Sequence, residues 1–83
     1  MKLLYFAWVR ERIGTSSEEI DCPPGVKTVG ELVDWLAARG GGYGEAFESA
    51  ALVRAAVNQD HADAAHPICD DDEIAFFPPV TGG

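Results

Sequence analysis

The hydrophobic positions near the start of the chain predict a strand over residues 3–9. Apolar residues occupy both alternating sets of this segment, whereas a strand with only one covered face would alternate with polar residues. We therefore expect the strand to lie inside a sheet, with both of its faces covered. Residues 10–14 then predict one short helical turn closed by Gly14, and residues 17–22 predict a strand that pairs with the first in an antiparallel hairpin.

A helical pattern begins at Thr28, which has the spacing of a capping box with Glu31. Four apolar residues then follow at the spacing of one helical face, which predicts the main helix: Val29, Leu32, Val33 and Leu36. The glycine-rich residues 40–44 are expected to form a loop. They lack the Lys-Ser/Thr of a phosphate-binding loop, and they follow a helix rather than a strand.

The second half of the chain alternates short apolar segments with polar turns. We expect a short helix over 45–50, a strand over 52–57, a brief edge strand over 61–63 and a last strand over 74–77. The strands would then enclose one main helix. This order predicts an α+β fold of the β-grasp type, with a mixed sheet packed on that helix. Residues 1–83 would form a single domain.

Composition and charge narrow the choice of partners. The 83 residues suffice for one small domain, and the formal net charge is −8. Nucleic acid and anionic membranes are therefore disfavoured, because both require a positive surface. No secretory leader or membrane-spanning run is apparent. The two cysteines, Cys22 and Cys69, have neither CxxC nor metal-ligand spacing, which favours free thiols in a reducing cytoplasm.

The last residues have a composition of their own. Pro78 and Pro79 would end sheet pairing after the last strand, because proline has no N–H and a fixed φ. Two β-branched residues that favour an extended backbone follow, and then two glycines without side chains: Val80, Thr81, Gly82 and Gly83. Residues 78–83 thus form an extended, flexible Gly-Gly tail that reaches at most ~20 Å. It could thread a narrow slot and present one acyl carbon. A frayed terminus or a chance pair of glycines are the alternatives.

Several other residues are candidates for contacts. If the helix covers one sheet face, the second apolar set needs a cover, so we expect Phe6, Phe77 and His61 to bind a partner protein; a position in the core is the alternative. His61 and His66 could suggest a metal site, but surface polar residues are favoured. The acidic residues 70–73 lack the spacing of a calcium loop, so we expect a solvated turn.

The chain resembles a known family at three places. Residues 71–83 (Asp-Asp-Glu-Ile-Ala-Phe-Phe-Pro-Pro-Val-Thr-Gly-Gly) resemble the C-terminal signature of the small, sulfur-carrying subunits of molybdopterin synthase. Residues 4–11 and 55–59 are similar in outline. The resemblance covers the whole chain and implies the ubiquitin-like β-grasp fold.

The resemblance also implies a mechanism. A ubiquitin-activating-like adenylyltransferase would use ATP to adenylate Gly83. A sulfur donor enzyme would convert the adenylate to a thiocarboxylate, 1-thioglycine, with no other cofactor bound. The tail would then enter the large subunit of the synthase, which holds the catalytic residues, in a heterotetramer. Sulfur would pass to cyclic pyranopterin monophosphate. A carrier for thiamine or tRNA thiolation and a non-covalent ubiquitin-like module are the alternatives.

Overall fold

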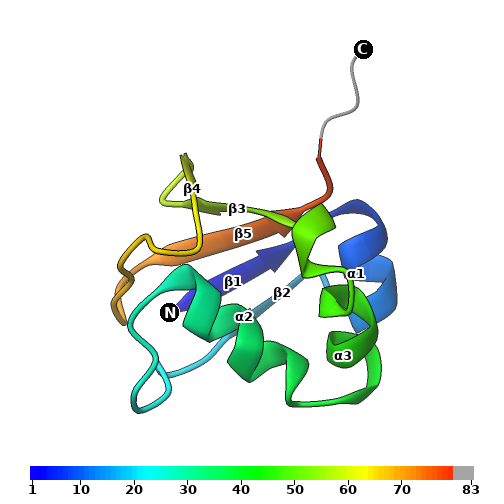
Figure 1. The fold of residues 1–83 in the computed structure, drawn as a ribbon, viewed down its shortest axis with the longest axis horizontal. Helices are drawn as coiled ribbons and strands as arrows, with labels where there is room; N and C mark the ends of the chain where they lie inside the picture. Colours follow the sequence, from blue (N-terminus) through cyan, green and yellow to red (C-terminus); the bar gives the residue numbers. More distant parts are fainter. Residues whose placement is uncertain (80–83) are drawn as a thin grey trace.

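Five strands form one mixed sheet in the computed structural model, which describes residues 1–79 apart from the side chain of Ala50. The strands are β1 (Lys2–Tyr5), β2 (Ser17–Glu19), β3 (Arg54–Val57), β4 (Asp60–Ala62) and β5 (Glu73–Phe77). Their order across the sheet is β2-β1-β5-β3-β4. The last strand therefore occupies the centre, parallel to β1 and antiparallel to β3 (Figure 1).

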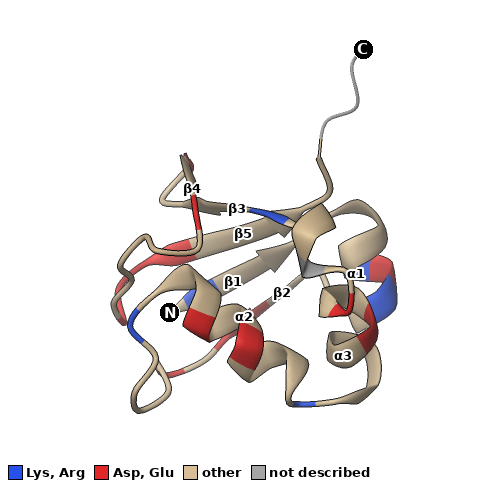
Figure 2. Cartoon of the chain, in the orientation of Figure 1, with Lys and Arg blue, Asp and Glu red and all other residues tan. Residues whose placement is uncertain are grey.

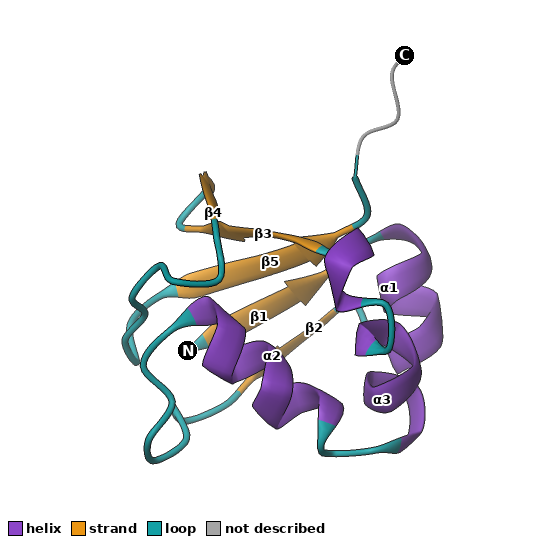
Figure 3. Cartoon of the chain, in the orientation of Figure 1, coloured by secondary structure: helices purple, strands orange, loops and turns teal. Residues whose placement is uncertain are grey.

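The helices share one side of this sheet. They are α1 (Ala7–Ile13), α2 (Val29–Ala37) and α3 (Gly41–Phe47), with a 3₁₀ turn, η1 (Ala50–Leu52), before β3 (Figure 3). Buried residues of all three helices join one core with the inward-facing residues of the strands, chief among them Leu3, Tyr5, Ile74 and Phe76. The α+β, β-grasp architecture is confirmed, with α2 as the longest helix. None of the helices within residues 1–79 has the length and apolar character needed to cross a bilayer.

The first strand is shorter than the expected 3–9. Phe6 is still extended and donates its N–H to the Phe76 carbonyl at 3.1 Å, but Ala7 turns the chain with a left-handed φ of 52°. The Val9 N–H then donates a hydrogen bond to the Phe6 carbonyl, which closes the first turn of α1. A short apolar run fits a strand or a buried helix equally well. Gly14, at φ 94°, ends the helix as expected.

The pairing of this strand agrees with the prediction. β1 lies inside the sheet, and β2 joins it antiparallel, although β2 spans only Ser17–Glu19 rather than 17–22. Leu4, on the face away from the helices, is half-buried.

The start of α2 agrees closely with the predicted capping box. The Thr28 hydroxyl accepts a hydrogen bond from the Glu31 N–H at 3.2 Å. The Glu31 carboxylate reaches back one residue further than expected, to the N–H of Lys27 at 2.9 Å. Of the predicted stripe, Val33 alone is only half-buried; Val29, Leu32 and Leu36 are in the core.

The glycine-rich residues 40–44 do not form the expected loop, because most of them belong to α3. A Cβ at Gly42 would lie 2.0 Å from the Arg12 carbonyl oxygen. Glycine at this position therefore lets α3 approach the backbone of α1, a contact that is invisible in the local sequence. The expected helix over 45–50 is the end of α3, and the strand expected from residue 52 begins at Arg54, because η1 occupies residues 50–52.

A hydrogen-bonded group, which we call the Glu18 cluster, fastens α2 and α3 to the β2 edge of the sheet. It consists of Tyr5, Glu18, Arg39 and Tyr43. The two tyrosine hydroxyls donate to one oxygen of Glu18, at 2.8 and 2.5 Å, and Arg39 donates to the other at 3.0 Å. Arg39 also lies over the rings of Trp35 and Tyr43.

The Glu18 cluster alters the acidity of its members. Burial by itself would raise the pKa of Glu18, but the hydrogen bonds from Tyr43, Tyr5 and Arg39 outweigh it and hold that pKa below its usual value. Burial, reinforced by the bond to Glu18, raises the pKa of the Tyr5 hydroxyl well above the usual range. The folded protein therefore favours an ionised Glu18 and a neutral Tyr5.

Candidate functional site

The chain leaves the sheet at the end of its central strand. Phe77 is the last paired residue, opposite Arg54 of β3. The chain then turns away from the sheet (Figure 1), where Pro78 has no N–H to continue the ladder. Pro78 and Pro79 are half-buried. The rest of the predicted tail lies outside the described residues, so its role remains a prediction: Val80, Thr81, Gly82 and Gly83.

The residues around this exit face away from the helices. Successive side chains of a strand point to opposite faces, and Phe76 is fully buried in the core, so Phe77 points to the outer face. Tyr5 pairs with Phe76 and is also buried, so the extended residue Phe6 points outward as well. The outer face is therefore apolar where β1 and β5 end.

The structure brings together two of the three predicted partner-binding residues. The rings of His61 and Phe77 lie edge to face, with centroids 5.6 Å apart. Phe6, a residue that is 46% exposed, flanks the strand end from the other side, because β1 and β3 lie on opposite sides of β5. We call Phe6, His61, Phe77 and Pro78 the tail exit. Phe6 and His61 are exposed, and Phe77 and Pro78 are half-buried. This partial exposure agrees with an interface, whereas the binding itself remains a prediction.

One exposed apolar residue near the exit was missed by the sequence analysis. Leu52 is 54% exposed and lies in η1, two residues before Arg54, the partner of Phe77 in the sheet. Figure 1 shows η1 close to the point where the chain leaves the sheet. Leu52 was assigned to a strand on its apolar character, and a 3₁₀ turn of three residues leaves no periodicity to reveal it.

Charge around the site is uneven. Figure 2 shows acidic residues on α2 and at the start of β5, with basic residues on α1 and at the start of β3. The basic residue of β3 is Arg54, beside the tail exit. No three His, Cys, Asp or Glu side chains come together as metal ligands would within residues 1–79. The described residues thus present exposed apolar side chains around the point where the chain leaves the central strand.

Comparisons with known proteins agree with the resemblance seen in the sequence. A molybdopterin synthase sulfur carrier subunit of Escherichia coli K12 is 46% identical over 85 residues, covering 100% of this chain and 99% of the relative. Another from Mycobacterium tuberculosis is 38% identical, covering 100% and 96%. The crystal structure of SAMP1 from Haloferax volcanii superimposes with a TM-score of 0.74 at 29% identity, covering 100% and 98%. The family model that matches residues 3–83 is that of the ThiS family, and the chain belongs to this family.

Proposed function

We propose that this chain is the sulfur carrier subunit of a molybdopterin synthase and works with a large catalytic subunit. The observation that carries the proposal is the full-length likeness to relatives with that name. The sequence of the tail, from Pro78 to Gly83, supports it. The apolar tail exit supports it further, because a carrier must present its terminus to another protein.

The chemistry takes place at Gly83. The terminal carboxylate attacks ATP, which releases pyrophosphate and leaves an acyl-adenylate with a good leaving group. Sulfur at the oxidation level of sulfide, supplied by the donor, displaces AMP and leaves a thiocarboxylate. That anionic sulfur then displaces a carbon-bound oxygen of cyclic pyranopterin monophosphate in the large subunit. Water cleaves the acyl–sulfur bond of the resulting thioester, which leaves the sulfur on the pterin and restores the carboxylate. Two such deliveries supply the dithiolene sulfurs of molybdopterin.

The fold provides what this chemistry requires of the carrier. β5 is the central strand and is paired on both sides, so the tail starts from a strand that hydrogen bonds hold at both edges. Pro78 and Pro79 limit the directions in which the tail can leave. Glycines at positions 82 and 83 leave the acyl carbon unhindered. Catalytic groups belong to the large subunit in this proposal.

The tail exit is the docking surface in this proposal. Phe6, His61 and Phe77 contact the large subunit, and the exposed Leu52 is a further candidate contact. Two copies of each subunit form a heterotetramer. The activating adenylyltransferase and the sulfur donor use the same terminus in turn. These reactions place the chain in the cytoplasm, where Cys22 and Cys69, both free, stay reduced.

The decisive experiment measures the intact mass of the chain after incubation with ATP, an activating enzyme and a sulfur source. A gain equal to one sulfur in place of one oxygen marks a covalent carrier, and an unchanged mass supports the non-covalent module instead. The product is then mixed with the large subunit and cyclic pyranopterin monophosphate. Formation of molybdopterin assigns the pathway. A thiocarboxylate that yields no molybdopterin points to thiamine or tRNA thiolation.

A further inference from the structure

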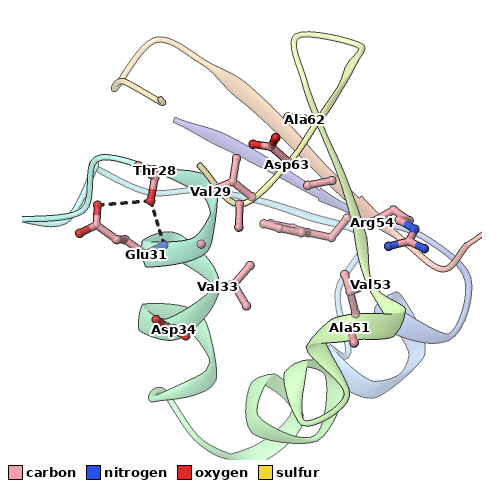
Figure 4. Close-up of a pocket in the computed structure, with 14 residues that line it drawn as sticks. Thr28, Val29, Glu31, Val33, Asp34, Ala51, Val53, Arg54, Ala62 and Asp63 are labelled. Carbon is pink, nitrogen blue, oxygen red and sulfur yellow. Dashed lines mark hydrogen bonds between the residues drawn. The ribbon is translucent and has the colours of Figure 1, made fainter. Parts of the chain in front are cut away.

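A groove of about 650 Å³ separates α2 from β3, β4 and η1 (Figure 4). Ala55 and Phe76, which line it, are inward-facing residues of the core. The groove therefore lies on the helix side of the sheet, whereas Phe77 and the tail exit belong to the outer face. A volume of this size accommodates a few side chains, since ligand pockets commonly span ~300–1,000 Å³.

Small side chains keep the groove open. Five of its lining residues are Gly30, Ala51, Ala55, Ala62 and Ala64. The first turn of α2 is held close to the segment after β4, because the Gly30 N–H donates to the Ala64 carbonyl at 2.9 Å. A Cβ at Gly30 would lie 3.1 Å from that same oxygen. One turn further on, the alanines of the sheet are too short to reach α2, and the space between them stays unfilled.

Apolar side chains remain accessible inside this groove. Val33 belongs to the stripe of α2 that otherwise enters the core, yet it is only half-buried, as is Val53 across the groove. Figure 4 shows both side chains directed toward the space between the helix and η1. Apolar surface left in water at a concave site favours burial against another apolar group.

The rim of the groove is acidic. Glu31, Asp34 and Asp63 line it and are exposed. Arg54 is the basic residue among the lining set, and it lies on the side opposite Glu31 and Asp34 (Figure 4). A binding segment would therefore meet negative charge along α2 and β4.

We propose that this groove binds a basic, aliphatic segment of a partner protein. An aliphatic side chain packs between Val33 and Val53, and a Lys or Arg pairs with Asp34 and Asp63. Charge complementarity selects this occupant. A second copy of the chain is a poor fit, because its net charge of −8 would be brought against the same acidic rim. The groove opens on the helix side of the sheet, whereas Phe6, His61 and Phe77 belong to the outer face, so a segment bound in the groove leaves these three side chains available.

The test titrates the full-length, ¹⁵N-labelled chain with a short peptide of alternating leucine and lysine, acetylated and amidated at its ends. The control peptide has glutamate in place of lysine. We expect saturable chemical-shift changes at the amides of α2 and β4 with the lysine peptide alone. Asp34→Lys should weaken this binding about fivefold or more, because it reverses a charge at the rim.

Matched variants distinguish binding in the groove from a general attraction between the basic peptide and the acidic chain. Asp71→Lys makes the same charge change at an exposed turn away from the groove and should leave binding within about twofold of wild type. Ala62→Leu fills the groove without altering charge and should abolish the chemical-shift changes caused by the lysine peptide. Removal of Gly83 should not affect peptide binding, so this test is independent of sulfur transfer.

Three outcomes would overturn the proposal. Equal binding of the glutamate peptide would remove charge as the basis of recognition. Shifts centred on Phe6 and Phe77 would assign the peptide to the tail exit instead. Concentration-dependent shifts of groove amides without any peptide would identify a second copy of the chain as the occupant.

Discussion

The β2 edge of the sheet and the end of β5 differ in how fully their side chains are packed and hydrogen-bonded within the chain. At β2, one carboxylate collects hydrogen bonds from two tyrosines and an arginine, and the rings around it are packed. At β5, the aromatic side chains are partly exposed, and proline ends the pairing. Groups satisfied within the chain contribute to stability, whereas unsatisfied apolar surface is available to another molecule.

This difference predicts that substitutions should separate into two classes. Changes on the helix side of the sheet, including the Glu18 cluster, should lower stability and leave sulfur transfer intact in the folded fraction. Changes at the tail exit and in the tail should impair sulfur transfer and leave stability nearly unchanged. Measuring stability and sulfur transfer on the same variants tests this separation.

Removing Gly83 should abolish sulfur transfer without changing the melting temperature. The acyl carbon would move back by one residue, about 3.3–3.6 Å in an extended chain, and misplacement by ~1 Å can cost around a hundredfold in a positioned reaction. Molybdopterin formation from purified subunits, with circular dichroism of the carrier, measures both. An added glycine should be equally harmful. Near-normal product from the shortened chain would mean that Gly83 does not carry the sulfur.

Gly42→Ala should destabilise the fold by about 2–3 kcal/mol, because the new methyl group would overlap the Arg12 carbonyl and force α3 away from α1. The matched control is Gly44→Ala in the same helix, where the Cβ has an ordinary contact of 3.6 Å with the Ala37 carbonyl. The control should be neutral or slightly stabilising, since alanine favours helix. Urea unfolding compares the two, and equal stabilities would refute the close approach of the helices.

Phe77→Asp should weaken association with the large subunit about tenfold, because an unpaired charge would enter an apolar contact. Its melting temperature should fall little, since Phe77 is outside the core cluster. Ser16→Asp, an exposed position before β2, adds the same charge elsewhere and is the control. Titration calorimetry gives both affinities. Indistinguishable affinities would remove Phe77 from the interface.

Glu18→Gln should cost about 1–2 kcal/mol at neutral pH, because the three donors lose a charged acceptor. The folded pKa of Glu18 lies below its ordinary value of 4.5, so its contribution is complete above the unfolded pKa. That contribution is lost as the pH falls through the folded pKa. The difference between wild type and variant should therefore narrow on acidification. Unfolding by urea at pH 7 and about pH 3 measures it, and a constant difference would contradict the assignment.

The features that depend on residues close together in the sequence were predicted most successfully. The cap at Thr28 and most of the apolar stripe of α2 need only neighbours along one helix. The last strand was bounded by the prolines that follow it. The family resemblance, which rested chiefly on residues 71–83, was confirmed by the comparisons. The role of Gly83 stays a prediction, because the structure describes residues 1–79.

The errors came where two distant segments meet. Val9 is buried and Trp8 packs against the core because α1 lies on it, and so short an apolar run does not distinguish a helix from a strand. Gly42 allows α3 to approach the Arg12 backbone, whereas a glycine-rich stretch ordinarily predicts a loop.

The apolar pattern along the chain was enough to predict the fold class and the main helix, because the residues that make up one helix or strand are close together in the sequence. The tertiary structure decided which apolar residues remain exposed around Phe77, how the Glu18 cluster joins four segments, and that a groove stays open beside Val33. These features depend on the sizes and positions of side chains from separate elements. Periodicity records which face of an element is apolar, but the distance to the opposite element is set only when the whole chain packs.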